Sequence, residues 1–155
     1  MKKLLMVLMV MAPVAGFAHE FTAGALKIGH PWTRATPAGS DMAAGYLSVT
    51  NTGKVADVLD AAEVDGVGHV MIHTIREEKG VAHMDEVDGV TVAPGQTVTL
   101  APGGVHLMWM DMAKPLKAGE LVSGTLSFKH AGKVAVQFKV EPLGAKAPVQ
   151  SAHHH

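Results

Sequence analysis

The sequence of 155 residues contains no cysteine, and that absence excludes several kinds of protein. Without thiols the chain has no disulfide framework, so burial of apolar side chains has to hold the fold together. A blue-copper electron-transfer site is excluded for the same reason, because it requires a thiolate ligand. Aromatic residues are also scarce, at 5% of the chain. This scarcity argues against an enzyme that binds a polysaccharide on a broad aromatic surface.

The sequence also lacks clusters of basic residues, segments with apolar residues at helical spacing, and residue patterns typical of catalysis. The chain has 13 basic and 14 acidic residues without a run of positive charge, which argues against nucleic acid or an anionic membrane surface as a partner. No segment repeats apolar residues at helical spacing between helix caps. No carboxylate pair, nucleophile with a nearby base, or phosphate-binding loop stands out. We therefore predict that the protein is not an enzyme.

The first 18 residues have the pattern of a secretory signal peptide. Lys2 and Lys3 form a positive segment, residues 4–14 are apolar, and Gly16-Phe17-Ala18 offers small residues at the cleavage positions. The apolar run is too short to span a membrane, and no later run is long enough. We predict an exported protein that begins at His19. Its 11 basic and 14 acidic residues then give a net charge of −3.

Apolar and polar residues alternate along most of the remaining chain, which is the pattern of half-buried β-strands. Turn signals such as Asp65-Gly66 and Pro94-Gly95 separate the alternating segments. Many short strands at this spacing predict an antiparallel sandwich or barrel. We expect one domain over residues 19–142 and a disordered tail over 143–155, where small and polar residues dominate. The candidate strands cover residues 26–28, 45–50, 55–64, 70–76, 81–87, 90–92, 97–100, 105–111, 121–128 and 134–140.

The stretch from Val105 to Met112 carries the strongest chemical signal. Successive side chains of a strand point to opposite faces. One face is therefore expected to carry one imidazole and three thioethers, from His106, Met108, Met110 and Met112. Asp111 is expected on the other face. Thioethers are soft ligands that select Cu(I), and imidazole suits copper generally. We interpret the stretch as half of a Cu(I) site.

A hairpin earlier in the chain supplies the other half. If Glu77 to Gly80 form a four-residue loop with a left-handed glycine, Arg76 pairs with Val81 and His73 lies directly opposite Met84. Directly opposed residues have Cβ atoms about 4.5–5.5 Å apart, close enough to share one metal ion. A three-residue loop would shift the register by one and turn Met84 to the other face.

Four of these residues follow a fixed spacing. His73, Met84, His106 and Met108 match H-x10-M-x21-H-x-M, which resembles the motif of the periplasmic copper chaperones of the PCuAC family. Similarity around residues 31–34, 46–51 and 100–108 extends the resemblance over about residues 24–139. The resemblance implies an all-β, antiparallel Greek-key β-sandwich of the cupredoxin-like kind, which binds one Cu(I) through those four side chains. It also implies delivery of copper in the periplasm to the CuA centre of cytochrome c oxidase, often alongside a Sco-type thiol protein. We expect a monomer.

The ligand chemistry agrees with this expectation. Two imidazoles and two thioethers are neutral donors, which favour monovalent copper over Zn(II) or Cu(II). The remaining methionines nearby are not motif positions, and we expect them to pack around the site rather than bind: Met71, Met110 and Met112. His69 and His83 are expected to face solvent or to support the ligands from outside.

Two other functions share parts of this pattern. A periplasmic copper buffer or storage protein without a dedicated client would use the same four ligands. A histidine-brace copper oxygenase would use the amine and imidazole of His19, although the thioether-rich motif argues against it. In a chaperone, His19 and the terminal residues His153-His154-His155 are candidates for binding Cu(II).

Overall fold

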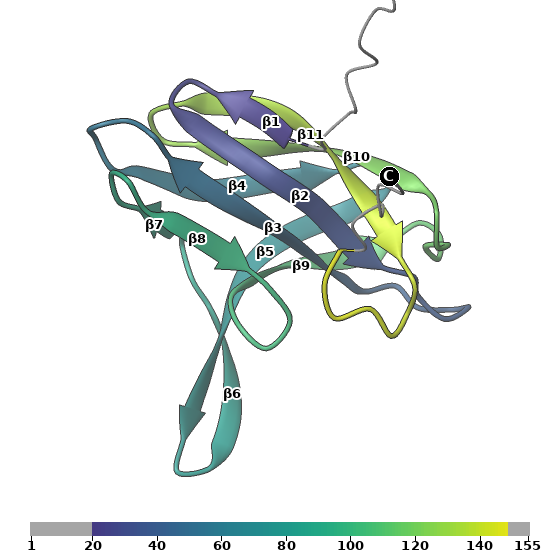
Figure 1. The fold of residues 1–155 in the computed structure, drawn as a ribbon. Helices are drawn as coiled ribbons and strands as arrows, with labels where there is room; N and C mark the ends of the chain where they lie inside the picture. Colours follow the sequence, from purple (N-terminus) through teal and green to yellow (C-terminus); the bar gives the residue numbers. More distant parts are fainter. Residues whose placement is uncertain (1–19, 149–155) are drawn as a thin grey trace, which may run out of the picture.

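Eleven β-strands and no helix make up the part of the chain that the computed structural model describes, residues 20–148 (Figure 1). No helix able to cross a membrane occurs in this part. The predicted signal peptide, His19 and the terminal histidines lie outside it. The strands are β1 (Glu20–Ala23), β2 (Leu26–Arg34), β3 (Ala43–Asn51), β4 (Asp57–Val64), β5 (Val67–Glu78), β6 (Val81–Glu86), β7 (Val90–Val92), β8 (Thr97–Leu100), β9 (His106–Met112), β10 (Leu121–Phe128) and β11 (Gly132–Glu141). The all-β prediction is confirmed.

Every predicted strand has a counterpart, but two features of the first hairpin were missed. β1 was not predicted, and β2 continues well past Ile28 to Arg34. At His30 the backbone has a φ of 46°, and the register between β2 and β3 shifts between Gly29 and Trp32. A bulge of this kind lets a strand continue through a local break in its pairing. The alternation of side chains is interrupted there, so the pattern alone ended the strand too early.

The strands form a β-sandwich around one core. Their hydrogen-bonded order is β6-β5-β9-β3-β2-β11-β10-β4-β7, with β1 beside β2 and β8 beside β3. The sheet folds over on itself, because Trp109 of β9 and Phe138 of β11 meet edge to face although other strands separate them in that order. Their ring centroids are 5.1 Å apart. Fully buried aliphatic side chains from both layers complete the core, among them Ile28, Leu107 and Leu126.

One pair of strands departs from the antiparallel prediction. β11 runs parallel to β2, with Lys139 beside Trp32 and Glu141 beside Arg34. The sheet is therefore mixed. The alternation of side chains reveals a strand but not the direction of its neighbour, and these two strands are separated by most of the domain.

The β5–β6 hairpin, which projects from the body of the sandwich (Figure 1), has a different register from the predicted one. Only Lys79 and Gly80 form its loop, with φ values of 52° and 79°. Two consecutive residues with positive φ are the requirement of a two-residue type I′ turn, which matches the natural twist of a hairpin. Consequently Arg76 pairs with His83, and Ile75 rather than His73 lies opposite Met84. The predicted four-residue loop is wrong.

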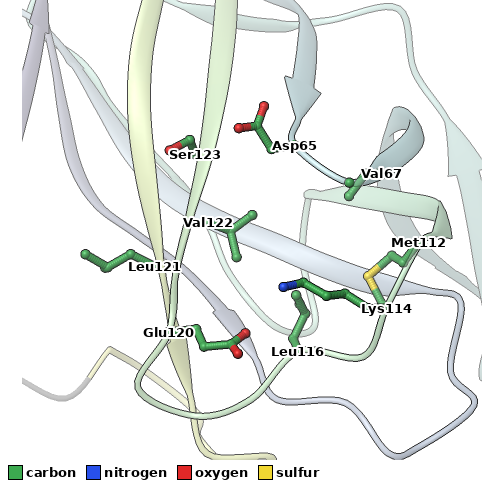
Figure 2. Close-up of a pocket in the computed structure, with 10 residues that line it drawn as sticks. Asp65, Val67, Met112, Lys114, Leu116, Glu120, Leu121, Val122 and Ser123 are labelled. Carbon is green, nitrogen blue, oxygen red and sulfur yellow. The ribbon is translucent and has the colours of Figure 1, made fainter.

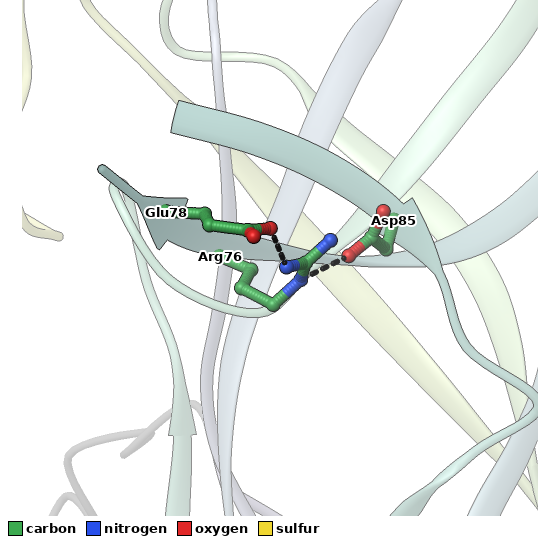
Figure 3. Close-up of polar contacts among 3 residues, drawn as sticks. All are labelled: Arg76, Glu78 and Asp85. Atoms are coloured by element: carbon green, nitrogen blue, oxygen red, sulfur yellow. Dashed lines mark hydrogen bonds and ion pairs between the residues drawn. The ribbon is translucent and has the colours of Figure 1, made fainter. Parts of the chain in front are cut away.

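Arg76 makes two ion pairs on the same hairpin (Figure 3). Its Nε donates to Asp85 Oδ2 at 3.0 Å, and its Nη1 donates to Glu78 Oε2 at 2.6 Å. These hydrogen bonds raise the pKa of Arg76, with that to Asp85 contributing most. Because Arg76 pairs with His83, both side chains lie on the face opposite His73 and Met84. The contact with Asp85 therefore links β5 to β6, whereas that with Glu78 stays within β5, and neither occupies the face that carries the candidate ligands.

Asp57 at the start of β4 is a buried carboxylate, with a residue exposure of 4%. It accepts backbone N–H groups from Val58 at 2.8 Å, His130 at 2.9 Å and Ala131 at 2.8 Å. Burial alone would raise the pKa of Asp57, but these three donors favour the charged form and hold that pKa below its usual value. The residue thereby ties the β10–β11 turn to β4.

Candidate metal centre

Strands β5 and β9 lie side by side and bring two alternating His and Met series together. His73 lies opposite His106, Met71 opposite Met108, and His69 opposite Met110. The residues between them, such as Ile72 and Leu107, are buried in the core, so the paired residues point to the other face. We call these six residues the His–Met ladder: His69, Met71, His73, His106, Met108 and Met110.

His106 is fixed with one ring nitrogen available. The residue is 5% exposed, and its Nδ1 lies 2.9 Å from the carbonyl oxygen of Gly104. A carbonyl only accepts, so Nδ1 carries the proton and donates it in this bond. The neutral ring then presents Nε2 as a lone-pair donor. Metal-binding histidines are commonly held in this way by a backbone carbonyl on the other nitrogen.

His73 faces His106 across the strand pair. The two ring centroids are 5.8 Å apart and the rings are nearly perpendicular, at 74°. The Nδ1 of His73 is buried and has no hydrogen-bond partner within residues 20–148. A buried polar atom left without a partner costs about 1–3 kcal/mol, so such an atom requires an explanation. A metal ion held between the two imidazoles would satisfy it, and the donor set therefore fits copper.

The two motif methionines occupy different positions. Met108 follows His106 on the same face of β9 and is half-buried. Met84 lies on β6 and is 54% exposed. Met84 pairs with Ile75, so these two side chains point to the same face. Ile75 is two residues from His73 and therefore shares the face of His73, which means that Met84 shares it too. The pair is diagonal rather than directly opposed, and the predicted sharing of a face is confirmed.

The strand pairing sets two further residues beside the motif residues, and Glu86 was not predicted among them. Glu86, not Met84, lies directly opposite His73. Met71 lies directly opposite Met108, which places a third thioether beside the motif residues. The alternating spacing His69-x-Met71-x-His73 was a visible signal for Met71. No signal in the sequence gave the register that sets Glu86 opposite His73.

Met112 points to the core and Asp111 to the ladder, which is the reverse of the predicted arrangement. Met112 is 9% exposed and belongs to the hydrophobic core. It lines a surface pocket with Val67, Leu116 and Val122 (Figure 2). Asp111 instead turns toward the ladder, with Oδ2 3.2 Å from Nδ1 of His69. The cause is local, because Asp111 has a φ of 55° and this left-handed residue ends the regular alternation of β9.

Sequence and structure comparisons place these features in a known family. The family described as "Putative lipoprotein LpqE-like" matches residues 26–140. The chain belongs to the LpqE-like family. One relative of this LpqE-like chain is the "Putative lipoprotein Lxx21020" of Leifsonia xyli subsp. xyli. It is 32% identical over 120 residues, which cover 77% of this chain and 71% of the relative.

Solved structures resemble the LpqE-like chain over most of its length. The copper-bound PCuAC domain from PmoF2 is 31% identical with a TM-score of 0.70, covering 80% of this chain and 98% of that domain. The solution structure of CuI-DR1885 from Deinococcus radiodurans is 28% identical with a TM-score of 0.60, covering 72% of this chain and 75% of that protein. The fold is thus the cupredoxin-like β fold of PCuAC domains, as the sequence resemblance implied. The ligand roles of His73, Met84, His106 and Met108 stay a prediction.

Proposed function

We propose that this protein is an exported copper chaperone that carries one Cu(I) per chain in a site formed by His73, Met84, His106 and Met108. The observation that carries the proposal is the pair of facing imidazoles. In that pair, the backbone holds His106 with Nε2 available, and the buried Nδ1 of His73 lacks a partner. Copper is the cargo of this site. The similarity to a copper-bound PCuAC domain and to CuI-DR1885 supports the same choice of metal.

The donor set favours monovalent copper. Two neutral imidazoles and two thioethers leave the positive charge of the ion uncompensated, and thioethers are soft ligands that prefer Cu(I). Zn(II) is held in proteins by thiolates, imidazoles and carboxylates, so a site with two thioethers should bind it weakly. Glu86 opposite His73 adds a nearby negative charge that attracts any cation, and a divalent ion more strongly, so the preference for Cu(I) comes from the two thioethers.

The geometry suits a carrier better than a permanent centre. His106 is buried and fixed, whereas Met84 is 54% exposed on the projecting hairpin. An acceptor can approach the exposed thioether first and exchange it for its own ligand, while the imidazoles still hold the ion. A dithiolate acceptor such as the CuA domain of cytochrome c oxidase then takes copper through softer and negatively charged sulfur. A Sco-type thiol protein in the periplasm is a second participant in this delivery. The chain acts as a monomeric carrier, not as an enzyme.

The metal assignment is tested by titration of the purified protein with Cu(I) and by copper K-edge absorption. We expect one tightly bound Cu(I) with mixed nitrogen and sulfur scattering. The variants His73→Ala and Met84→Leu should weaken binding by about 10–100-fold or more, because even residues that only support metal ligands have effects of that order. Val55→Ala is the control, since Val55 is also an exposed apolar residue, at 68%, and lies in the loop between β3 and β4. A shell of nitrogen and oxygen alone would contradict the site.

The chaperone and buffer functions differ only in the recipient. The copper-loaded protein is mixed with an isolated CuA domain, the two are separated, and the copper in each is measured. Transfer to the CuA domain, in preference to a cysteine-free control domain, supports the chaperone. Full retention by the loaded protein in the presence of excess acceptor favours the buffer.

A further inference from the structure

The His–Met ladder continues beyond the proposed copper site. Past His73 and His106, the next pair on the same face is Met71 with Met108, and the next is His69 with Met110. Neither His69 nor Met110 belongs to the proposed site. Successive pairs on one face are about 6.6–6.8 Å apart along the strands. The outer pair therefore lies too far from the facing imidazoles to bind the same ion.

His69 is held in the form that a metal ligand requires. Its Nδ1 lies 3.2 Å from Oδ2 of Asp111. The carboxylate beside this nitrogen favours the neutral tautomer with the proton on Nδ1, which leaves a lone pair on Nε2. Carboxylate contacts of this kind fix the ring and the tautomer of metal-binding histidines. The side chain of His69 is 53% exposed, so the free nitrogen is accessible to an incoming ion.

The local backbone conformation favours the contact between Asp111 and His69. Asp111 has a φ of 55°, which turns its side chain toward the ladder instead of the opposite face. Gly68 of β5 faces it closely, because a Cβ on Gly68 would lie 2.7 Å from the Cβ of Asp111. Any larger residue at position 68 would push Asp111 away. The contact thus depends on a left-handed aspartate and a glycine together, next to two thioethers.

We propose that His69, Met110 and Met71 form a second Cu(I) site at the outer end of the ladder. The proposal rests on the proposed function, since it makes this site a place where copper enters or leaves the carrier. One imidazole and two thioethers are neutral and soft, which favours Cu(I) over harder ions. His69 and Met110 are directly opposed, and methionine has three rotatable bonds, so Met71 can reach the same ion from the next pair. Three ligands and greater exposure make this site weaker than the proposed one.

Met71 also connects the two sites. It lies directly opposite Met108, a ligand of the proposed site, and two residues from His69. Cu(I) bound by His69, Met71 and Met110 can gain the sulfur of Met108 as it loses the nitrogen of His69. It then exchanges Met110 for the imidazole of His106 and Met71 for that of His73, and binds Met84 as the fourth ligand. All of these ligands are neutral, so copper stays monovalent and neither a proton nor an electron is transferred.

The test follows the methionine methyl groups by carbon–proton NMR while the full mature protein is titrated with Cu(I) under reducing conditions. The first equivalent is expected to shift Met84 and Met108, and the second to shift Met110 and Met71. In the double variant with His69→Ala and Met110→Leu, the affinity for the second equivalent should fall at least tenfold, with the first unchanged. His83→Ala is the matched control, because His83 is an exposed histidine on the opposite face.

The outcomes separate this proposal from the proposed function. A Met110 methyl that never moves, or an equal loss of the second equivalent in His83→Ala, overturns the second site and leaves the first intact. If the double variant weakens the first equivalent as strongly as His106→Ala does, the ladder is one extended site and the proposal of two sites is wrong. If Met84 and Met108 stay unshifted while Met110 and Met71 respond, the second site stands and the assignment of the first fails.

Discussion

Gly45 on β3 controls how closely that strand approaches β9, the strand that carries His106 and Met108. Gly45 pairs with Leu107, and a Cβ placed on it would lie 2.7 Å from Nε1 of Trp109 and 3.0 Å from two ring carbons. Trp109 has no exposed surface and packs edge to face against Phe138. The indole therefore has no free space into which it can shift. We predict that Gly45→Ala is destabilising although alanine is otherwise better than glycine in a strand.

The magnitude follows from two opposed effects. Inserting a methyl group into a close-packed core costs about 1–3 kcal/mol. Replacing glycine at a position with ordinary φ returns about 0.4–1 kcal/mol by restricting the unfolded chain. The net loss in the free energy of unfolding is then between about 0 and 2.6 kcal/mol, and about 1.3 kcal/mol at the midpoints, which lowers Tm by a few degrees in a domain of this size. Gly144→Ala is the control, since a Cβ there meets no atom within 4 Å.

Urea unfolding of the single and double variants tests this reasoning. Trp109→Phe removes the ring atoms that clash with the new Cβ, at the cost of a cavity. In the Trp109→Phe background, Gly45→Ala should therefore cost at least about 0.5 kcal/mol less than in the original protein, which is the range of couplings between residues in contact. Additive losses would show that the clash with the indole is not the cause. A Gly45→Ala variant as stable as the Gly144→Ala control would refute the packing argument itself.

Three further predictions concern protons and the hairpin. If His73 and His106 both bind copper, both imidazoles must be neutral, so the logarithm of the Cu(I) affinity should rise with pH. The limiting slope in acid should be near two for the original protein and near one for His73→Ala. Competition titrations over a pH series measure both slopes. Asp57 has a lowered pKa in the folded protein, so its stabilising effect is present above the unfolded value of about 3.9 and is lost as pH falls through the folded pKa. Asp57→Asn should lower the free energy of unfolding at neutral pH by about 1–3 kcal/mol, and urea unfolding over a pH series should show that the loss of stability due to protonation of Asp57 has disappeared. An unchanged pH profile would contradict the role of the three backbone donors. Lys79 occupies a left-handed turn position that asparagine tolerates better, so Lys79→Asn should slow amide hydrogen exchange in β6; faster exchange would argue against the type I′ turn.

Local chemistry alone determined a large part of this protein. The alternation of apolar and polar residues located the strands, since the two faces of a strand differ in burial wherever one packs on a core. The same alternation placed His106 with Met108, and His73 with Met71, on common faces. The soft, neutral side chains predict Cu(I) as the bound metal from their chemistry alone. Each of these conclusions depends only on residues close together in the chain.

The tertiary structure decided what the spacing left open. The pairing of β5 with β9 sets His73 against His106, although 32 residues separate them, because both strands bury their other face in one core. The two-residue turn at Lys79 moved Met84 to a diagonal position, and the left-handed Asp111 sent Met112 into the core. A strand pattern has a period of two and cannot distinguish registers that differ by two residues. Turn geometry and core packing resolve that choice, and they are properties of the folded molecule.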